Sequence, residues 1–222
     1  MERRRIATGM LDLDVALGGW TSLGEIGFQM EWGMVRPSTV LLSAEQGAGA
    51  STLMQQIAAY VAAHNGTSRG VLYISGDESV DSLAVRGARL HADHQLVWAR
   101  HVKTVRGVEE SVAHYGPVMT IVDTVQSMRL PEHENSVPEN TLEHQVAVAK
   151  MCASLAQAHS TCVWLINRTS KLDPARAREA AIDERLAREV DVAMWMHVEP
   201  HPETGRRLSI HAYKNRFSPV LR

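Results

Sequence analysis

Short apolar runs separated by helical patterns constrain the fold of this sequence more than any other feature. The runs are continuously apolar rather than alternating, which is typical of strands buried on both faces of a parallel sheet. Five such runs are Val40–Ser43, Val71–Ser75, Val118–Asp123, Cys162–Asn167 and Val192–Val198. A sixth run, Leu208–Tyr213, alternates more regularly and is expected to be an edge or antiparallel strand.

Helical patterns fill the intervals between these runs. Residues 52–64 place their apolar side chains along one stripe, Ser79 is a suitable N-cap for a helix that ends near Leu90, and residues 141–159 form the longest pattern. Alternating strands and helices predict an α/β fold, in which right-handed crossovers connect parallel strands. Residues 20–34 have no clear period, and residues 129–140 are predicted to form a mobile loop.

Composition limits the classes of function. The 222 residues suffice for one large domain, and 23 basic against 25 acidic residues give a net charge of −2, so DNA could be bound only through a local basic patch. The sequence has neither an apolar run of about 20 residues nor a signal peptide. We therefore expect no membrane partner and a cytoplasmic location. Cys152 and Cys162 lack metal or redox spacing and are predicted to be buried thiols.

The segment from Ser43 to Thr52 has the composition of a phosphate-binding loop between a strand and a helix. Glycines would let backbone N–H groups converge on an anion, and the N-terminus of the helix adds a partial positive charge. The residues predicted to surround the phosphates are Gly47, Ala48, Gly49, Ala50, Ser51 and Thr52. A tight strand-to-helix turn without a ligand is the alternative interpretation.

Two positions depart from the phosphate-loop pattern G-x-x-x-x-G-K-[ST]. Ala44 replaces the first glycine, where a small residue suffices, whereas Ala50 replaces the lysine. That lysine neutralises β- and γ-phosphate oxygens during transfer. Its absence predicts that most ATP hydrolysis is lost, and makes ATP a doubtful ligand held weakly by backbone and metal. An Ala50 engineered to trap nucleotide would instead imply a working natural ATPase.

Several further segments, in order along nearly the whole chain, resemble the RadA/Sms and DnaB-helicase group of RecA-fold P-loop proteins. The matching segments are Arg5–Gly19, Leu72–Ser79, Val118–Gln126, Val190–Met196 and Tyr213–Pro219. This resemblance implies a RecA-like parallel-sheet core with antiparallel strands at its C-terminal end. It also implies that residues 1–222 are a single core domain, with 20–34 as an insertion and without the zinc module and Lon-like protease domain of RadA.

The resemblance also implies roles for individual residues. Asp123 would hold Mg²⁺ or Mn²⁺, directly or together with Ser51. Asp77 stands where the family has the glutamate that polarises water; it is one methylene shorter, and Glu78 is the neighbouring acid. Lys214 and Arg216 match the pair that reaches the γ-phosphate of an adjacent subunit, which implies a homo-oligomer, expected to be a hexameric ring.

A basic stretch follows the fourth apolar run, Cys162–Asn167. In RadA and RecA this region faces DNA, so cations here would contact phosphates without reading sequence. The DNA-binding residues expected from this position are Arg168, Lys171, Arg176 and Arg178. The alternative is an ordinary salt-bridged surface helix, because acidic residues are interleaved with the arginines.

Three alternative hypotheses about function are consistent with this sequence. The leading hypothesis is a DNA-binding RecA-type oligomer of replication, recombination or repair with weak or absent ATP hydrolysis. The second is a metal-dependent nuclease in which Asp77, Glu78 and Asp123 activate water. The third is a non-catalytic paralogue that regulates an active partner. The pairs His91/His94 and His197/His201 have spacings that a metal could use, but we interpret both as structural.

Overall fold

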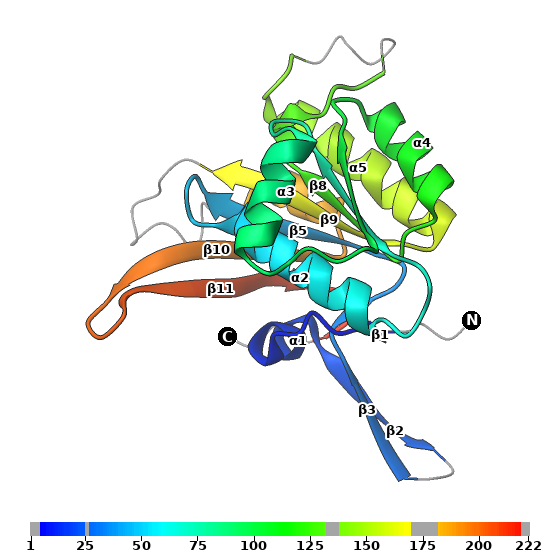
Figure 1. Cartoon of the computed structure of the whole chain (residues 1–222), viewed down its shortest axis with the longest axis vertical. Coiled ribbons are helices and arrows are strands. Elements are labelled where there is room, and N and C mark those ends of the chain that lie inside the picture. The colour runs from blue at the N-terminus through cyan, green and yellow to red at the C-terminus, as the bar shows by residue number, and fades with distance from the viewer. Residues whose placement is uncertain (1–4, 25–26, 132–137, 170–181, 219–222) are drawn as a thin grey trace.

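A seven-stranded sheet forms the centre of this computed structural model, which describes residues 5–24, 27–131, 138–169 and 182–218 (Figure 1). The strand order is β11-β10-β5-β9-β8-β6-β7, and every neighbouring pair is parallel except β10 and β11. The strands are β5 (Ser38–Glu45), β6 (Val71–Ser75), β7 (Val97–His101), β8 (Met119–Asp123), β9 (Cys162–Thr169), β10 (Val192–His201) and β11 (Gly205–Asn215). The predicted α/β class, the buried parallel strands and the antiparallel C-terminal strand are confirmed.

Helices cover both faces of this sheet (Figure 1). On one face, α2 (Ala50–His64) and α3 (Val80–Arg89) pack over an apolar cluster that also includes Trp164. On the other face, α4 (Val105–Tyr115), α5 (Leu142–His159) and α7 (Glu184–Arg188) enclose a second cluster. Because both faces are covered, β6 and β8 are buried along their whole length, and β5 and β9 are buried up to their carboxyl ends, which explains their continuous apolarity.

Side-chain caps fix the starts of α3, α4 and α5. Ser79, Thr104 and Thr141 accept hydrogen bonds from the backbone N–H groups of Ser82, Gly107 and His144 at 3.2, 3.0 and 3.2 Å. Each such cap contributes about 1 kcal/mol to the stability of a helix. The predicted cap at Ser79 and the predicted long helix near 141–159 are thus confirmed.

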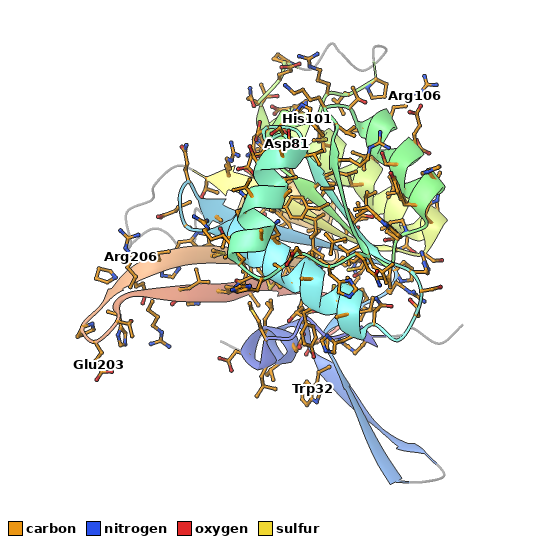
Figure 2. All side chains as sticks on the ribbon, in the orientation of Figure 1. Trp32, Asp81, His101, Arg106, Glu203 and Arg206 are labelled. Atoms are coloured by element: carbon orange, nitrogen blue, oxygen red, sulfur yellow. The ribbon has the colours of Figure 1, made fainter. Side chains whose placement is uncertain are left out.

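The segment 20–34, whose sequence has no clear helical or strand period, lies mostly in an antiparallel hairpin of β2 (Gly19–Gly24) and β3 (Gly27–Trp32). Figure 1 shows that it projects from the body of the molecule, and Figure 2 places Trp32 at its base, next to α1 (Leu11–Leu17). The strand β7 and the helix α4 were also not anticipated. The exposed or half-exposed residues of β7 explain why its sequence lacks the apolar signal of the central strands.

The two ends of the described chain are joined by hydrogen bonds around α1. Arg5 begins β1 (Arg5–Ile6), which pairs with β4 (Met34–Val35), and its Nη1 donates to the carbonyls of Gly18 and Gly33 at 2.6 and 2.7 Å. From the other end, Asn215 Nδ2 donates to the carbonyl of Leu17 at 3.1 Å. The first and last motifs of the sequence therefore meet at one place.

Both cysteines are free and fully buried, as predicted, and burial raises the pKa of each thiol to about 12. No helix in the described part of the chain has the length and apolarity needed to cross a membrane. The central residues 132–137 of the predicted loop lie outside the described residues.

Candidate nucleotide site

The phosphate loop lies between β5 and α2, as the sequence predicts. Gly47 and Gly49 have φ values of +84° and +92°, which other residues adopt only with strain. Apart from the adjacent residues, no atom of the described part of the chain lies within 4 Å of the position where a Cβ would project from either glycine. The turn thus leaves open space at the N-terminus of the 15-residue helix α2, where backbone N–H groups can bind an anion.

Ala50 is the first residue of α2, and only 8% of its surface is exposed. Its methyl group belongs to the apolar cluster beneath α2. Ser51 and Thr52, the hydroxyl residues that follow, are half-buried at the start of the helix. The loop therefore offers backbone and hydroxyl groups to a phosphate, but no ammonium group from position 50.

Asp123 ends β8 beside this loop and is 2% exposed. The hydroxyl of Tyr73, on the neighbouring strand β6, donates to Asp123 Oδ2 at 2.7 Å and lies 3.4 Å from the carbonyl oxygen of Ser51. Desolvation, and then the charge of Asp123, raise the pKa of Tyr73 well above its usual value. The other oxygen, Asp123 Oδ1, is buried without a hydrogen-bond partner among the described residues.

Asp77 follows β6 and contacts a different group. Its Oδ2 lies 2.9 Å from Arg168 Nη2, at the end of β9, and 3.5 Å from the hydroxyl of Thr124. Both members of the ion pair are partly exposed, so it contributes little to stability. Arg168, predicted to contact DNA, is thereby placed at the edge of the candidate nucleotide site.

Glu78 turns away from Asp77 towards helix α3. Its carboxylate oxygens lie 2.9 and 2.8 Å from Arg86 Nη1, and Arg86 Nε donates to Gln55 Oε1 at 2.7 Å. Gln55 in turn donates to the carbonyl of Leu83 at 2.7 Å, so this network joins α2 to α3. The backbone carbonyl of Glu78 contacts His101 Nδ1 at 2.9 Å, and Figure 2 shows His101 beside the start of α3.

The three carboxylates of the nuclease hypothesis are therefore held by three different partners: Tyr73, Arg168 and Arg86. A shared metal would require their oxygens to converge. In the described part of the chain, they do not form a group of side chains close enough to hold one ion. This arrangement does not favour the nuclease hypothesis.

A second network crosses the sheet at the carboxyl ends of β5 and β9. Asn167 Nδ2 donates to Ser43 Oγ at 3.1 Å, and Asn167 Oδ1 accepts from Gln126 Nε2 at 2.5 Å. Gln126 also donates to the carbonyl of Arg168 at 3.0 Å. The network connects the strand that enters the phosphate loop with the residues after Asp123.

Lys214 and Arg216, predicted to act on an adjacent subunit, contact their own chain here. Lys214 Nζ donates to the carbonyls of Ala187 and Val190, each at 2.8 Å, at the end of α7. Burial and then the charge of Arg216 lower the pKa of Lys214. Arg216 Nη1 lies 2.8 Å from Asp191 Oδ1, whose other oxygen accepts from the N–H of Thr39 at 3.0 Å.

Comparison with curated proteins finds similarity to DNA repair proteins named RadA. The chain is 27% identical over 197 residues to the DNA repair protein RadA of Bacillus subtilis, covering 89% of this chain and 40% of that protein. It is 29% identical over 217 residues to the RadA of Halalkalibacterium halodurans, covering 96% and 41%. With the RadA of Haemophilus influenzae the identity is 26% over 226 residues, covering 99% and 42%. The chain has a RadA-like RecA core.

This RadA-like chain spans about two fifths of the length of the curated relatives that it matches. No family model matches its sequence. Three of the four predicted DNA-binding residues, Lys171, Arg176 and Arg178, lie outside the described residues.

Sequence reasoning missed three residues that hold the site of this RadA-like core together: Tyr73, Gln55 and Arg86. Tyr73 carried a usable signal, because the hydroxyl of a buried tyrosine in the middle of an apolar strand needs a hydrogen-bond partner. Gln55 carried another, as a buried amide on the apolar face of α2. Nothing in the sequence identified Arg86, whose partners come from two other segments.

Proposed function

We propose that this RadA-like chain acts in DNA repair or recombination as a DNA-binding RecA-type oligomer that binds nucleotide weakly and hydrolyses it slowly or not at all. Its relatives are named DNA repair protein RadA, and the similarity to two of them covers 96% and 99% of this chain. DNA contact is assigned to Arg168 and to the basic stretch that follows it.

The observation that carries this proposal is the buried alanine at the start of α2. A lysine there would place an ammonium group among the phosphate oxygens, where charge develops during transfer. The arginines described at this edge of the sheet, Arg168 and Arg86, are already paired with Asp77 and Glu78. We therefore expect that either arginine could take the place of the lysine only by breaking its ion pair.

The other parts of the site fit a phosphate and its magnesium ion. Asp123 Oδ1 is buried without a hydrogen-bond partner in the described part of the chain, and the hydroxyl of Ser51 is half-buried. Both are hard oxygen donors of the kind that Mg²⁺ prefers. The ion would neutralise phosphate charge, with Ser51 and Asp123 holding it or its water shell. Gly47 and Gly49 leave the backbone free to approach the phosphates.

Assembly into a hexameric ring belongs to the same proposal. In such a ring, Lys214 and Arg216 would reach the nucleotide of the next subunit only after leaving the carbonyls of Ala187 and Val190 and the carboxylate of Asp191. Their contacts within the chain would then keep the pair ordered in the free protomer. A change in oligomeric state on addition of nucleotide and DNA would be the sign of this exchange.

The test restores the missing charge. Ala50→Lys is expected to raise DNA-stimulated phosphate release by about 10²-fold, the effect of one preorganised charge on a transferring group. Ala50→Met is the matched control, because it adds similar bulk without charge and should leave turnover unchanged. Phosphate release and the length of end-labelled DNA are followed together, with Mg²⁺ or Mn²⁺.

Three outcomes would contradict the proposal. Rapid ATP turnover by the unaltered chain would show that the lysine is dispensable here. Equal activation by Ala50→Met would show that charge is not what is missing. Strand cleavage without ATP, abolished by Asp123→Ala, would instead support the nuclease hypothesis.

A further inference from the structure

The hairpin of β10 and β11 places a tryptophan, two histidines and a glutamate on one face. Successive side chains of a strand alternate between faces, so Trp195, His197 and Glu199 share one side of β10. Trp195 is paired across the hairpin with His211, which therefore lies beside His197 on the same face. The sequence pairing of His197 with His201 did not identify this neighbour.

The potential ligand atoms of His197, Glu199 and His211 all lie within 4.8 Å of one another. Among the described residues, no other group of three histidine, cysteine or acidic side chains has its potential ligand atoms as close together. His197 Nε2 and Glu199 Oε1 are 2.5 Å apart, while the rings of His197 and His211 are nearly parallel, with centroids 5.2 Å apart. Two imidazoles and one carboxylate thus converge at a single point of the hairpin.

The surroundings of this group hold it in place and leave it accessible. The ring of Trp195 stacks on His197 with centroids 4.1 Å apart and an interplanar angle of 9°. The side chain of His197 is 13% exposed, whereas that of Glu199 is 48% exposed, so an ion can approach from the side of Glu199. His197 Nδ1 is buried and has no partner among the described residues.

We propose that His197, Glu199 and His211 bind one divalent transition-metal ion, with zinc the best match to their donor atoms. Two imidazole nitrogens and one carboxylate oxygen form a donor set that holds zinc in proteins and leaves a fourth position open. Zinc bonds of about 2.0–2.1 Å place tetrahedral donors roughly 3.3 Å apart, so side-chain rotations suffice to close the group around an ion.

The proposed metal site lies where the β10–β11 hairpin leaves the sheet. His197 follows Met196, which is paired with Ala44 on the strand that enters the phosphate loop. Beyond the site the hairpin extends past the rest of the sheet, and Figure 2 shows Glu203 and Arg206 near its far end. An ion held by both strands would cross-link the hairpin close to where it leaves the body of the protein. Metal binding by these three residues requires neither ATP hydrolysis nor DNA binding.

The first experiment titrates the full chain, freed of metal with a chelator, with Co²⁺ and with Zn²⁺. Co²⁺ should bind with one ion per chain and produce the visible absorption of a low-symmetry nitrogen–oxygen site, and Zn²⁺ should displace it. His211→Gln and Glu199→Gln should each lower the affinity at least tenfold. His201→Gln is the matched control, because His201 lies on the same hairpin and is the residue whose spacing from His197 suggested a metal site in the sequence. This variant should bind the metal as the unaltered chain does.

A second measurement separates loss of binding from loss of folding. Zn²⁺ should raise the Tm of the unaltered chain, because an ion that binds only the folded state stabilises it. Glu199→Gln changes one half-exposed oxygen, so this variant should keep the circular dichroism of the parent while losing the Tm increase. Absence of one-to-one binding, or binding that His211→Gln leaves intact, would overturn the proposal and leave the group as a stacked aromatic patch.

Discussion

In the described part of the chain, the hydroxyl of Tyr73 is the hydrogen-bond donor to the buried carboxylate of Asp123. Tyr73→Phe removes that donor and keeps the ring. A buried carboxylate left without a partner costs about 1–3 kcal/mol of folding free energy. We therefore expect the urea midpoint of unfolding to fall by a corresponding amount, with the m-value unchanged.

Tyr115→Phe is the matched control for this residue. Tyr115 stacks on Trp98 with ring centroids 5.1 Å apart, a contact that phenylalanine retains. Its free energy of unfolding should change by less than about 0.5 kcal/mol. If both variants lose the same stability, the hydroxyl of Tyr73 has no special role in holding Asp123.

At the scale of a single element, Lys214 satisfies backbone carbonyls at the end of the five-residue helix α7. Lys214→Met keeps the apolar stem and removes the ammonium, so carbonyls of α7 lose a charged donor. We expect a loss of about 1 kcal/mol in the free energy of unfolding, because the side chain is only partly buried. Thermal and urea unfolding measure this loss.

Lys150→Met, at an exposed position of α5, is the control and should leave stability unchanged. The same Lys214 variant, introduced together with Ala50→Lys, also tests the predicted role towards an adjacent subunit. A loss of phosphate release larger than the loss of stability explains would support that role. Unchanged release would limit Lys214 to holding α7.

At the scale of the whole molecule, Asn215 connects the C-terminal motif to α1. One of its hydrogen-bond acceptors, the carbonyl of Ala16, lies 199 residues earlier in the sequence. Asn215→Ala removes donors to the carbonyls of Ala16 and Leu17, which end that helix. We expect a loss of about 1–2 kcal/mol and faster hydrogen exchange in residues 11–18, while α4 and α5 keep their protection.

Asn65→Ala is a comparison variant with a similar number of hydrogen bonds made locally. Its side chain donates to the carbonyls of Val61 and Arg69, within four residues of itself. This variant should lose stability without a selective change in the exchange of residues 11–18. Equal exchange patterns in the two variants would show that the ends of the chain are not coupled through Asn215.

The central strands and three of the helices could be predicted because their signals are local. A strand covered on both faces must be apolar at every position, and a helix that covers a sheet must be apolar on one stripe. The phosphate loop could be predicted for the same reason, since glycines, a helix start and hydroxyls are adjacent in sequence. The edge strand β7 could not, because a half-exposed strand has no such composition.

By itself the sequence determined the α/β class, the strands of the core, the position of the phosphate loop and the absence of its lysine, because each depends on neighbouring residues. Only the tertiary structure decided which partners the charged and polar groups take. Asp123 bonds to Tyr73, Asp77 to Arg168, and Glu78 to Arg86, and His197 approaches His211 rather than His201. These pairings depend on strand order and hairpin register, which bring together residues whose separation in sequence carries no information about their distance in space.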